Sequence, residues 1–448
     1  MLRPVRALAA AAAGLAVLAL AATGLAAPAT AASTAATAAR TTAAAPASQP
    51  SDPRIADAVV VIGTAGLRWD DVHTLSTPSL WDVSRRASIG TLAARSVRSS
   101  ACPADGWLAL SSGARAADLP GAAYGECRRL VNPTVDGVVR GWEDFVESAQ
   151  QEDYDPRLGL LGETLADAGR PAAAIGPGAA IALADGDGHV TGAYAPRPAG
   201  NDALRAEVGA ALETADLVVV DVGAVRDTGR ATVLRADPTD EPTPEPTGDA
   251  AEPAPTGEEP AGPEVITEPT RPEQVRPVDD RIGAVLAAVE ASDRDITVLL
   301  VSLADSGTRA RMQLAAALGP APDGSSYGAS LLGSRSTRQP GMIQATDVTP
   351  TVLAALGLLD EAPSGALVGA PVLPVDGPGN ANQRLRAVLD IDQHSVAVRP
   401  LTPRFYTVLI VSNLVLYLLV SLGLNGRALG ALSRVAARRA GVAARAVA

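Results

Sequence analysis

Lysine is absent from the 448-residue sequence, and histidine, cysteine and aromatic residues are few. Every fixed side-chain cation is therefore an arginine. The formal net charge of -12 argues against nucleic acid as a partner. The three histidines and two cysteines form no group with zinc-ligand spacing, which restricts the available metal chemistry. With only 3% aromatic residues, the core must consist mainly of alanine, valine and leucine, which argues against a large aromatic-lined pocket.

The N-terminus has the pattern of a secretory signal peptide over residues 1–31. Two arginines precede an apolar core at 7–22, and Ala29-Thr30-Ala31 resembles a small-residue cleavage site. An uncleaved membrane anchor is the alternative, and both place the following residues outside the cytoplasm. Residues 32–53, rich in alanine, threonine and proline, are predicted to be a disordered linker.

The sequence predicts an α/β domain over residues 54–376. Strand-like and helix-like segments alternate, which indicates a largely parallel sheet with helices on both faces. The clearest predicted strands are 59–62, 89–97, 172–184, 217–222 and 296–302. The clearest predicted helices are 105–115, 201–214, 278–291 and 349–356. Residues 237–277, rich in proline, glutamate and threonine, interrupt the domain as a predicted disordered insertion, with a calcium-binding role for its carboxylates as the alternative.

The C-terminal part predicts attachment to a membrane. Residues 405–424 contain no charged residue and are long enough to cross the hydrocarbon core as one helix. The arginine-rich tail at 425–448 is predicted to be cytoplasmic by the positive-inside rule. Residues 377–404 are assigned to a juxtamembrane segment. The chain is thus predicted to be a single-pass protein of the cell membrane whose main domain lies outside the cytoplasm.

One stretch, Val59 to Asp71, indicates where a functional site would lie. A buried strand ends there in Gly63-Thr64-Ala65-Gly66 and is followed by the carboxylates Asp70 and Asp71. Ligands of open α/β sheets bind beyond the carboxyl ends of the strands. Asp70 and Asp71 are interpreted either as metal ligands or as residues that cap or solvate the next segment.

Several motifs, in a fixed order, resemble the alkaline phosphatase superfamily, which includes sulfatases, nucleotide pyrophosphatases and cofactor-independent phosphoglycerate mutases. The first is VVVIGTAGLRWDDV followed by TPSLWDVSRRASIGTL, and the second is CPADGWLALSSGAR. ITVLLVSLADSG is similar to the family's late strand and Ser-Asp-His-Gly motif, and TDVTPTVLAALGL is similar to a later helix. The resemblance covers roughly residues 57–374 and implies an alkaline-phosphatase-like fold.

The resemblance also implies a metal-dependent hydrolase, but the sequence departs from it at the metal ligands. The family's enzymes hold two divalent metals with aspartate and histidine ligands, which clamp the transferred group. Ala65 stands where the first aspartate is expected, and Ser306 replaces a histidine beside Asp305. The remaining candidate metal ligands are Asp70, Asp221, Asp227 and Asp305. The histidines His73, His189 and His394 do not complete a site.

Two residues of the second motif are candidate catalytic residues. Cys102 lies near the family's nucleophile position, and a free nucleophilic thiol is one interpretation. A structural disulfide between Cys102 and Cys127 is the other, and it is favoured in an exported domain. Asp105, at the start of the same predicted helix, is either catalytic or a carboxylate that interacts with the helix dipole.

These observations favour a membrane-anchored protein whose domain is catalytically inactive and serves a binding or structural role at the cell envelope. No cofactor is expected in that case. One alternative is a divergent phosphatase, phosphodiesterase or sulfatase-type enzyme that acts on envelope components and uses a divalent metal. Another is a sensory or assembly module that works with an integral membrane partner.

Overall fold

The computed structural model describes residues 56–121, 125–235, 269–424, 430 and 433–434. The chain divides into two units, Met1–Ser51 and Asp52–Ala448, and all described residues belong to the second. The predicted signal peptide, the predicted linker and most of the predicted insertion therefore lie outside the described residues. Most of the predicted cytoplasmic tail does so too.

The main sheet runs in the order β13-β11-β2-β9-β8-β1-β6-β4-β5 within the described residues, with β10 and β12 pairing at its side. The strands are β1 (Ala58–Ala65), β2 (Ser88–Ala93), β4 (Ala172–Ile175), β5 (Ala193–Ala195), β6 (Leu217–Ala224), β8 (Ile296–Ser302), β9 (Met312–Pro320), β10 (Ser326–Tyr327), β11 (Leu331–Ser334), β12 (Met342–Gln344) and β13 (Val372–Val375). The central strands β8, β1, β6 and β4 are mutually parallel, whereas β9 is antiparallel to both β8 and β2. A small second sheet pairs β3 (Cys127–Arg128) with β7 (Thr232–Val233).

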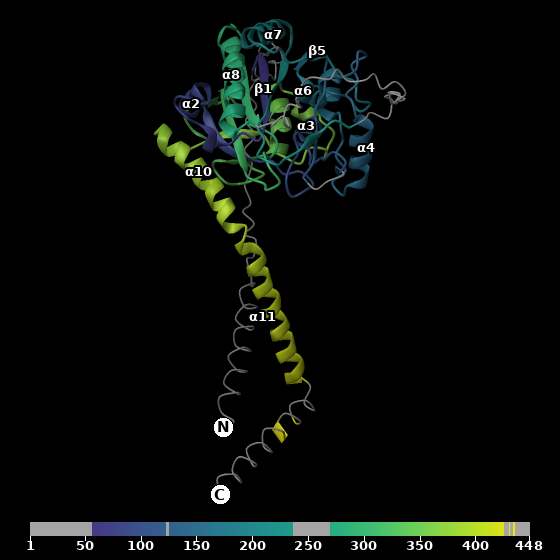
Figure 1. The fold of residues 1–448 in the computed structure, drawn as a ribbon, viewed down its shortest axis with the longest axis vertical. Coiled ribbons are helices and arrows are strands. Elements are labelled where there is room, and N and C mark those ends of the chain that lie inside the picture. The colour runs from purple at the N-terminus through teal and green to yellow at the C-terminus, as the bar shows by residue number, and fades with distance from the viewer. Residues whose placement is uncertain (1–55, 122–124, 236–268, 425–429, 431–432, 435–448) are drawn as a thin grey trace, which may run out of the picture. The chain divides into compact units, whose positions relative to one another are not determined.

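Helices cover both faces of this sheet (Figure 1). One face packs against α3 (Pro103–Ser112), α4 (Trp142–Gln151), α5 (Leu160–Asp167), α6 (Pro177–Ala182) and α9 (Val348–Ala355). The other packs against α2 (Pro78–Arg86), α7 (Asn201–Thr214), α8 (Arg271–Glu290) and α10 (Ala381–Val398). The remaining elements are short 3-10 helices at Trp69–Asp71, Ala345–Asp347 and Leu359–Glu361, and helix α11 (Leu401–Leu424). The predicted α/β class, with a largely parallel sheet that is covered by helices on both faces, is confirmed.

The packing of strand β1 explains why residues 58–62 are all apolar. Val59 and Val61 belong to the core on the α3 face, whereas Val60 and Ile62 belong to the core on the α8 face. Successive side chains of a strand point to opposite faces, and here both faces are covered. An uninterrupted apolar run is the expected sequence for such a strand.

The sequence-based prediction of a strand over residues 172–184 is wrong in its second half. The strand β4 ends at Ile175, and residues Pro177–Ala182 form the helix α6. Gly176 has φ of 93°, a conformation that glycine adopts readily, and Pro177 fits the first turn of a helix. The run of alanines is compatible with either structure, so the Gly-Pro pair decides the boundary.

The predicted disordered insertion extends too far at its C-terminal end. It was expected to continue to residue 277, but α8 begins at Arg271. Thr270 precedes the helix, and its backbone N–H donates to Glu273 Oε2 over 2.7 Å, which caps the first turn. The two first turns of α8 therefore belong to the folded domain.

The predicted juxtamembrane segment is also part of the domain. Residues 381–398 form α10, in which Val388 is fully buried against the α8 face and Arg384 is buried beside it. Arg384 donates from Nη2 to the backbone oxygen of Arg85 over 2.8 Å. The domain boundary predicted at residue 376 is wrong because α10 supplies part of the core.

Helix α11 matches the predicted membrane-spanning segment and begins four residues earlier than expected, at Leu401. Its segment Leu401–Leu422 is long and apolar enough to cross a membrane, and no part of it is buried within the described residues. This exposure is the arrangement that a lipid-facing helix requires.

Candidate functional site

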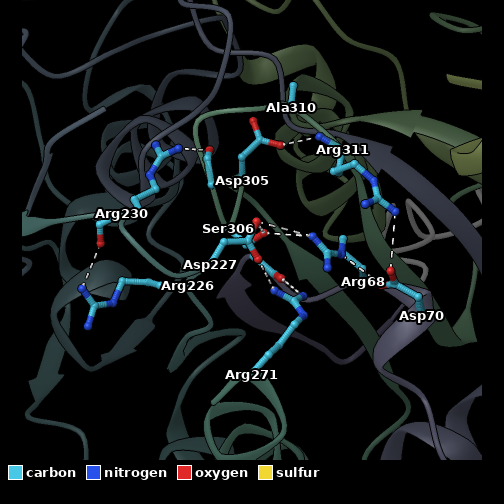
Figure 2. A network of polar contacts seen from close by, with 12 residues as sticks. Arg68, Asp70, Arg226, Asp227, Arg230, Arg271, Asp305, Ser306, Ala310 and Arg311 are labelled. Carbon is cyan, nitrogen blue, oxygen red and sulfur yellow. Dashed lines mark hydrogen bonds and ion pairs between the residues drawn. The ribbon is translucent and has the colours of Figure 1, made fainter. Parts of the chain in front are cut away.

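Three neighbouring parallel strands end at the same edge of the sheet, and the loops that follow them meet there (Figure 2). Arg68 follows β1, Asp227 follows β6 and Ser306 follows β8. The Ser306 hydroxyl donates to Asp227 Oδ2 over 3.0 Å and accepts from Arg68 Nη1 over 3.1 Å. Arg68 Nη1 also lies 3.8 Å from Asp227 Oδ2. Three strand ends are thus joined by one polar group.

Gly66 allows the loop after β1 to pass between the other two loops. Its φ is 75°, and a Cβ atom there would lie 2.0 Å from the backbone oxygen of Val225 and 2.8 Å from Ser306 Cβ. Neither neighbour is the end of a flexible side chain. The glycine that the sequence places four residues before Asp70 is therefore required for the close approach of these loops.

Arg271, from the first turn of α8, completes this group. Its Nε and Nη2 atoms each lie 2.6 Å from one carboxylate oxygen of Asp71, and Nη1 lies 2.9 Å from Asp227 Oδ1. Nη2 also donates to the Gly66 carbonyl over 2.7 Å. Burial lowers the pKa of Arg271, but hydrogen bonding and charge from Asp71 and Asp227 outweigh it, and the net shift of the pKa is upward. The two-pronged contact with Asp71 is the strong geometry for an arginine–carboxylate pair.

A third arginine, Arg311, extends the group toward α10. Arg68 Nε pairs with Asp70 Oδ1 at 3.0 Å, and Arg311 Nη2 lies 3.5 Å from Asp70 Oδ2. Arg311 also donates to Asp392 of α10, whose Oδ1 accepts from the Met312 backbone N–H over 3.0 Å. The hydrogen bonds that Arg311 donates to Asp392 raise the pKa of Arg311, although burial acts in the opposite direction. We call the connected set the arginine–carboxylate cluster; it comprises Arg68, Asp70, Asp71, Asp227, Arg271, Ser306, Arg311 and Asp392.

Asp305 lies beside the cluster, but its oxygens face other donors. Oδ2 accepts from the Ala101 N–H over 2.9 Å, and Oδ1 accepts from the Arg311 N–H over 2.9 Å and from Gln313 Nε2 over 3.1 Å. Burial raises the pKa of Asp305 to about 6, although these hydrogen bonds and nearby arginines act in the opposite direction. Asp305 therefore holds the loop after β8 against the loop before α3.

Asp221, on β6, is not part of the cluster. Its Oδ2 accepts from the Gly178 N–H over 3.0 Å, its Oδ1 accepts from the Gly223 N–H over 2.8 Å, and Arg197 lies 3.1 Å from Oδ1. The four candidate metal ligands are thus divided: Asp70 and Asp227 lie in the cluster, Asp305 lies next to it, and Asp221 serves the turn into α6.

Cys102 and Cys127 are joined by a disulfide with an S–S distance of 2.13 Å. The sulfur of Cys102 is therefore not a free thiol in this structure. Arg230 lies against the bond, with Nη2 at 2.9 Å from Cys127 Sγ and 3.3 Å from Cys102 Sγ. Asp105 is buried, and its carboxylate accepts from the backbone N–H groups of Cys102 and Asp118 over 2.9 Å each. Burial is the largest effect on the pKa of Asp105 and raises it.

The structure reveals functional candidates that the sequence analysis did not name, namely Arg68, Arg271 and Arg311. Arg271 lies 200 positions from Asp71 and 44 from Asp227, so no local pattern brings these residues together. The one available signal was the position of Arg271 directly after Thr270 and two residues before Glu273, which marks a helix start. His73, His189 and His394 are all exposed and lie outside the cluster.

A two-metal centre, which the resemblance implies, does not fit the residues present. Asp71 and Asp227 direct their oxygens at guanidinium groups, and Asp305 and Asp221 direct theirs mainly at backbone N–H groups. A cation in the cluster would have to share these oxygens with positively charged arginines, which is electrostatically unfavourable. In the described part of the chain, no three histidine, cysteine or acidic side chains are arranged to hold a metal ion.

Comparisons with known proteins give similarity of fold only. No family model and no curated protein matches the chain. A solved structure of an alkaline phosphatase superfamily protein from Vibrio parahaemolyticus is similar, at 11% identity and a TM-score of 0.39, over 71% of each chain. A Bacteroides thetaiotaomicron structure, described with the metabolism of multiple glycosaminoglycans, is similar at 14% identity and a TM-score of 0.38, over 70% of this chain and 75% of the other. The structure of murine ectonucleotide pyrophosphatase/phosphodiesterase 5 is similar at 13% identity and a TM-score of 0.28, over 55% of this chain and 56% of the other.

Proposed function

We propose that the chain is a membrane-attached binding domain without metal-dependent hydrolase activity. The observation that carries this proposal is the occupation of the sheet edge by arginine. Arg68 and Arg271 place their guanidinium groups between Asp71, Asp227 and Ser306, 2.6–3.1 Å from the oxygen atoms they contact. A guanidinium group stays protonated and cannot act as a Lewis acid or activate a bound water.

In this proposal, the role of the arginine–carboxylate cluster is to stabilise the loops at the strand ends. It joins the loops after β1, β6 and β8 to the first turn of α8, and its bidentate pair is held in one geometry. A scaffold whose strand-end loops are fixed to one another can present neighbouring surfaces without itself reacting. The extracytoplasmic location and the role at the cell envelope rest on the sequence patterns at the two ends of the chain.

The proposal is tested on the full chain purified in detergent. Metal content is measured together with turnover of phosphate monoesters, phosphate diesters and sulfate esters, with and without added zinc, manganese and calcium. We expect less than one metal ion per chain. We also expect that the unmodified chain turns over these esters no faster than the double variant Asp227→Asn/Asp305→Asn. Stoichiometric metal together with metal-dependent turnover that this double variant abolishes would overturn the proposal and establish the hydrolase alternative.

One observation favours that alternative enough to justify the double variant. The pKa of Asp305 is raised to about 6, and carboxyl groups with raised pKa values are frequent at catalytic sites. Its three hydrogen bonds to Ala101, Arg311 and Gln313 account for the same residue as a structural support. Turnover that depends on Asp305 would distinguish the two roles.

A further inference from the structure

A pocket of about 980 Å³ opens beside the arginine–carboxylate cluster. Most of its walls come from residues 93–99 at the end of β2, residues 310–312 at the start of β9, and the C-terminal half of α10. Strand β2 is antiparallel to β9, which is antiparallel to β8, so β2 ends at the same edge as the central strands. The pocket therefore lies at the edge where α/β sheets bind their ligands.

The pocket has a strongly positive lining in a protein of formal net charge -12. Arg95, Arg98, Arg115 and Arg399 all line it. None of the four forms an ion pair with a carboxylate in the part of the chain that the structure describes. A fifth arginine of the lining, Arg311, is paired with Asp392. The lining contains one carboxylate, that of the exposed Asp390. Four unpaired guanidinium groups around one cavity favour an anionic ligand.

Three of these arginines donate hydrogen bonds to neutral groups, and Arg98 and Arg399 in addition interact at longer range with the buried Asp105 and Asp305. Arg115 donates to the Tyr154 hydroxyl over 3.2 Å and lies 5.3 Å above the centre of its ring. Arg98 donates to the backbone oxygen of Asp118, and Arg399 donates to the backbone oxygen of Ala310. Each guanidinium carries five N–H donors, so each retains donors for a ligand.

The same pocket has an apolar wall. Its apolar lining includes Val97, Met312, Met342, Ile391 and Val398. Methionine side chains adapt to ligands of varied shape. A free inorganic anion would leave this wall in contact with water, whereas a molecule with an anionic head and an apolar part would cover both.

The pocket reaches the helix that attaches the protein to the membrane. Thr402, in the first turn of α11, is one of its lining residues, and α10 leads directly into that helix. Membrane lipids carry an anionic headgroup next to acyl chains, and they are the amphiphiles available at the end of a membrane-spanning helix. Arginine binds phosphate groups in a two-pronged geometry.

From this charge, shape and position we infer that the pocket binds the phosphate-bearing headgroup of an anionic membrane lipid. Arg95, Arg98, Arg115 and Arg399 contact the headgroup, and Val97 and Val398 contact the start of the acyl chains. The inference goes beyond the proposed function, and turnover at the arginine–carboxylate cluster would leave it standing.

The test uses the full chain in lipid nanodiscs that contain a photoactivatable phosphatidylglycerol, with a photoactivatable phosphatidylcholine in parallel. Cross-linked peptides are identified by mass spectrometry. We expect the anionic probe to label peptides containing residues 93–99 and 390–402. In the triple variant Arg95→Gln/Arg115→Gln/Arg399→Gln this labelling should fall roughly tenfold or more, because each arginine near an anionic lipid contributes measurably to its binding.

The matched control is Arg129→Gln/Arg205→Gln/Arg335→Gln, which removes the same charge from exposed positions outside the pocket. Its labelling should equal that of the unmodified chain, and the thermal unfolding of both triple variants shows whether they are folded. Equal labelling by the two lipid probes, or unchanged labelling in the pocket variant, would overturn the inference. Displacement of the lipid probe by millimolar glycerol phosphate would also overturn it, because the ligand would then be a soluble phosphoester.

Discussion

At the scale of single residues, Arg271 joins three parts of the site. It neutralises Asp71, whose side chain is only 6% exposed, and reaches Asp227 and the Gly66 carbonyl as well. Removing one partner of a buried ion pair leaves the other charged and without its hydrogen bonds. The stability of the strand-end loops should therefore depend on this one side chain.

The variant Arg271→Gln should lose about 2–3 kcal/mol of folding free energy, because it leaves a buried carboxylate without its partner. Solvent at the exposed part of the cluster keeps the loss from being larger. Denaturation of the detergent-purified chain, followed by tryptophan fluorescence, measures the change. Arg205→Gln, on the exposed face of α7, should change it by less than about 0.5 kcal/mol. Adding Asp71→Asn to Arg271→Gln should recover part of the loss; an additive loss would contradict a direct pairing.

Asp305 should make stability depend on pH. Burial raises its pKa to about 6 from the ordinary 3.8, so between these pH values the folded protein holds a proton that the unfolded chain releases. Its contribution is greatest below pH 4 and falls as the pH rises through 6, by about 3 kcal/mol in total. The difference in unfolding free energy between the unmodified chain and Asp305→Asn, measured from pH 4 to pH 7, should show this decline. A constant difference would refute it, and the exposed Asp202→Asn provides the control.

The sequence shows where the carboxylates at the strand ends lie, but it does not show which arginines pair with them. A buried strand ending in glycines before Asp70 and Asp71 correctly marks the sheet edge where the cluster lies. The interpretation of Asp71 as a capping residue agrees with its acceptance of the Arg68 N–H over 2.9 Å. The arginines that pair with these carboxylates come from distant segments, and a single sequence contains no signal for such long-range pairing.

At the scale of elements, α3 packs on β1 without space for a side chain on the strand. A Cβ atom on Gly63 would lie 2.1 Å from Trp107 Cη2, and one on Gly178 of α6 would lie 2.1 Å from Trp107 Nε1. Trp107 is buried. The two glycines thus form the surface on which the indole ring rests, and they fix how closely α3 and α6 approach the sheet.

Gly63→Ala should therefore destabilise the domain by about 3 kcal/mol, because a closely packed core has no room to shift. Gly209→Ala, in the middle of α7 with open space around it, should instead stabilise it by about 0.5–1 kcal/mol through higher helix propensity. Thermal unfolding of both variants tests the pair. A Gly63→Ala variant as stable as the unmodified chain would show that Trp107 can move.

The bounds of helices and strands can be predicted where the apolar residues follow either the helical or the strand period alone. Residues 201–214 and 296–302 were predicted as a helix and a strand with the bounds that α7 and β8 have. An alanine-rich segment such as 172–184 favours neither period, and Pro272 and Pro277 make the start of α8 resemble the proline-rich insertion before it. Pro272 lies in the first turn, where its missing N–H costs nothing, whereas Pro277 lies inside the helix and removes one of its hydrogen bonds.

At the scale of the whole molecule, α10 belongs to the domain, and α11 is the candidate membrane-spanning helix that follows it. A chain ending at Pro400 should remain in the supernatant after membranes are sedimented, whereas the full chain should sediment and require detergent. Ending the chain at Gly379 removes Val388, Arg384 and the Asp392 partner of Arg311. That form should be less stable by about 3 kcal/mol or more. Equal unfolding temperatures for the two truncated forms would show that α10 is dispensable.

The strand order has a consequence for when the protein can fold. Strand β2 lies between β9 and β11, and β1 lies beside β8, so the strands made before residue 236 are interleaved with those made after residue 269. The first half cannot complete its sheet until the ribosome has supplied β13. At a synthesis rate of roughly 5–20 residues per second, its apolar strands wait for about ten seconds or more. During that interval these strands lack the neighbours with which they pair in the finished sheet.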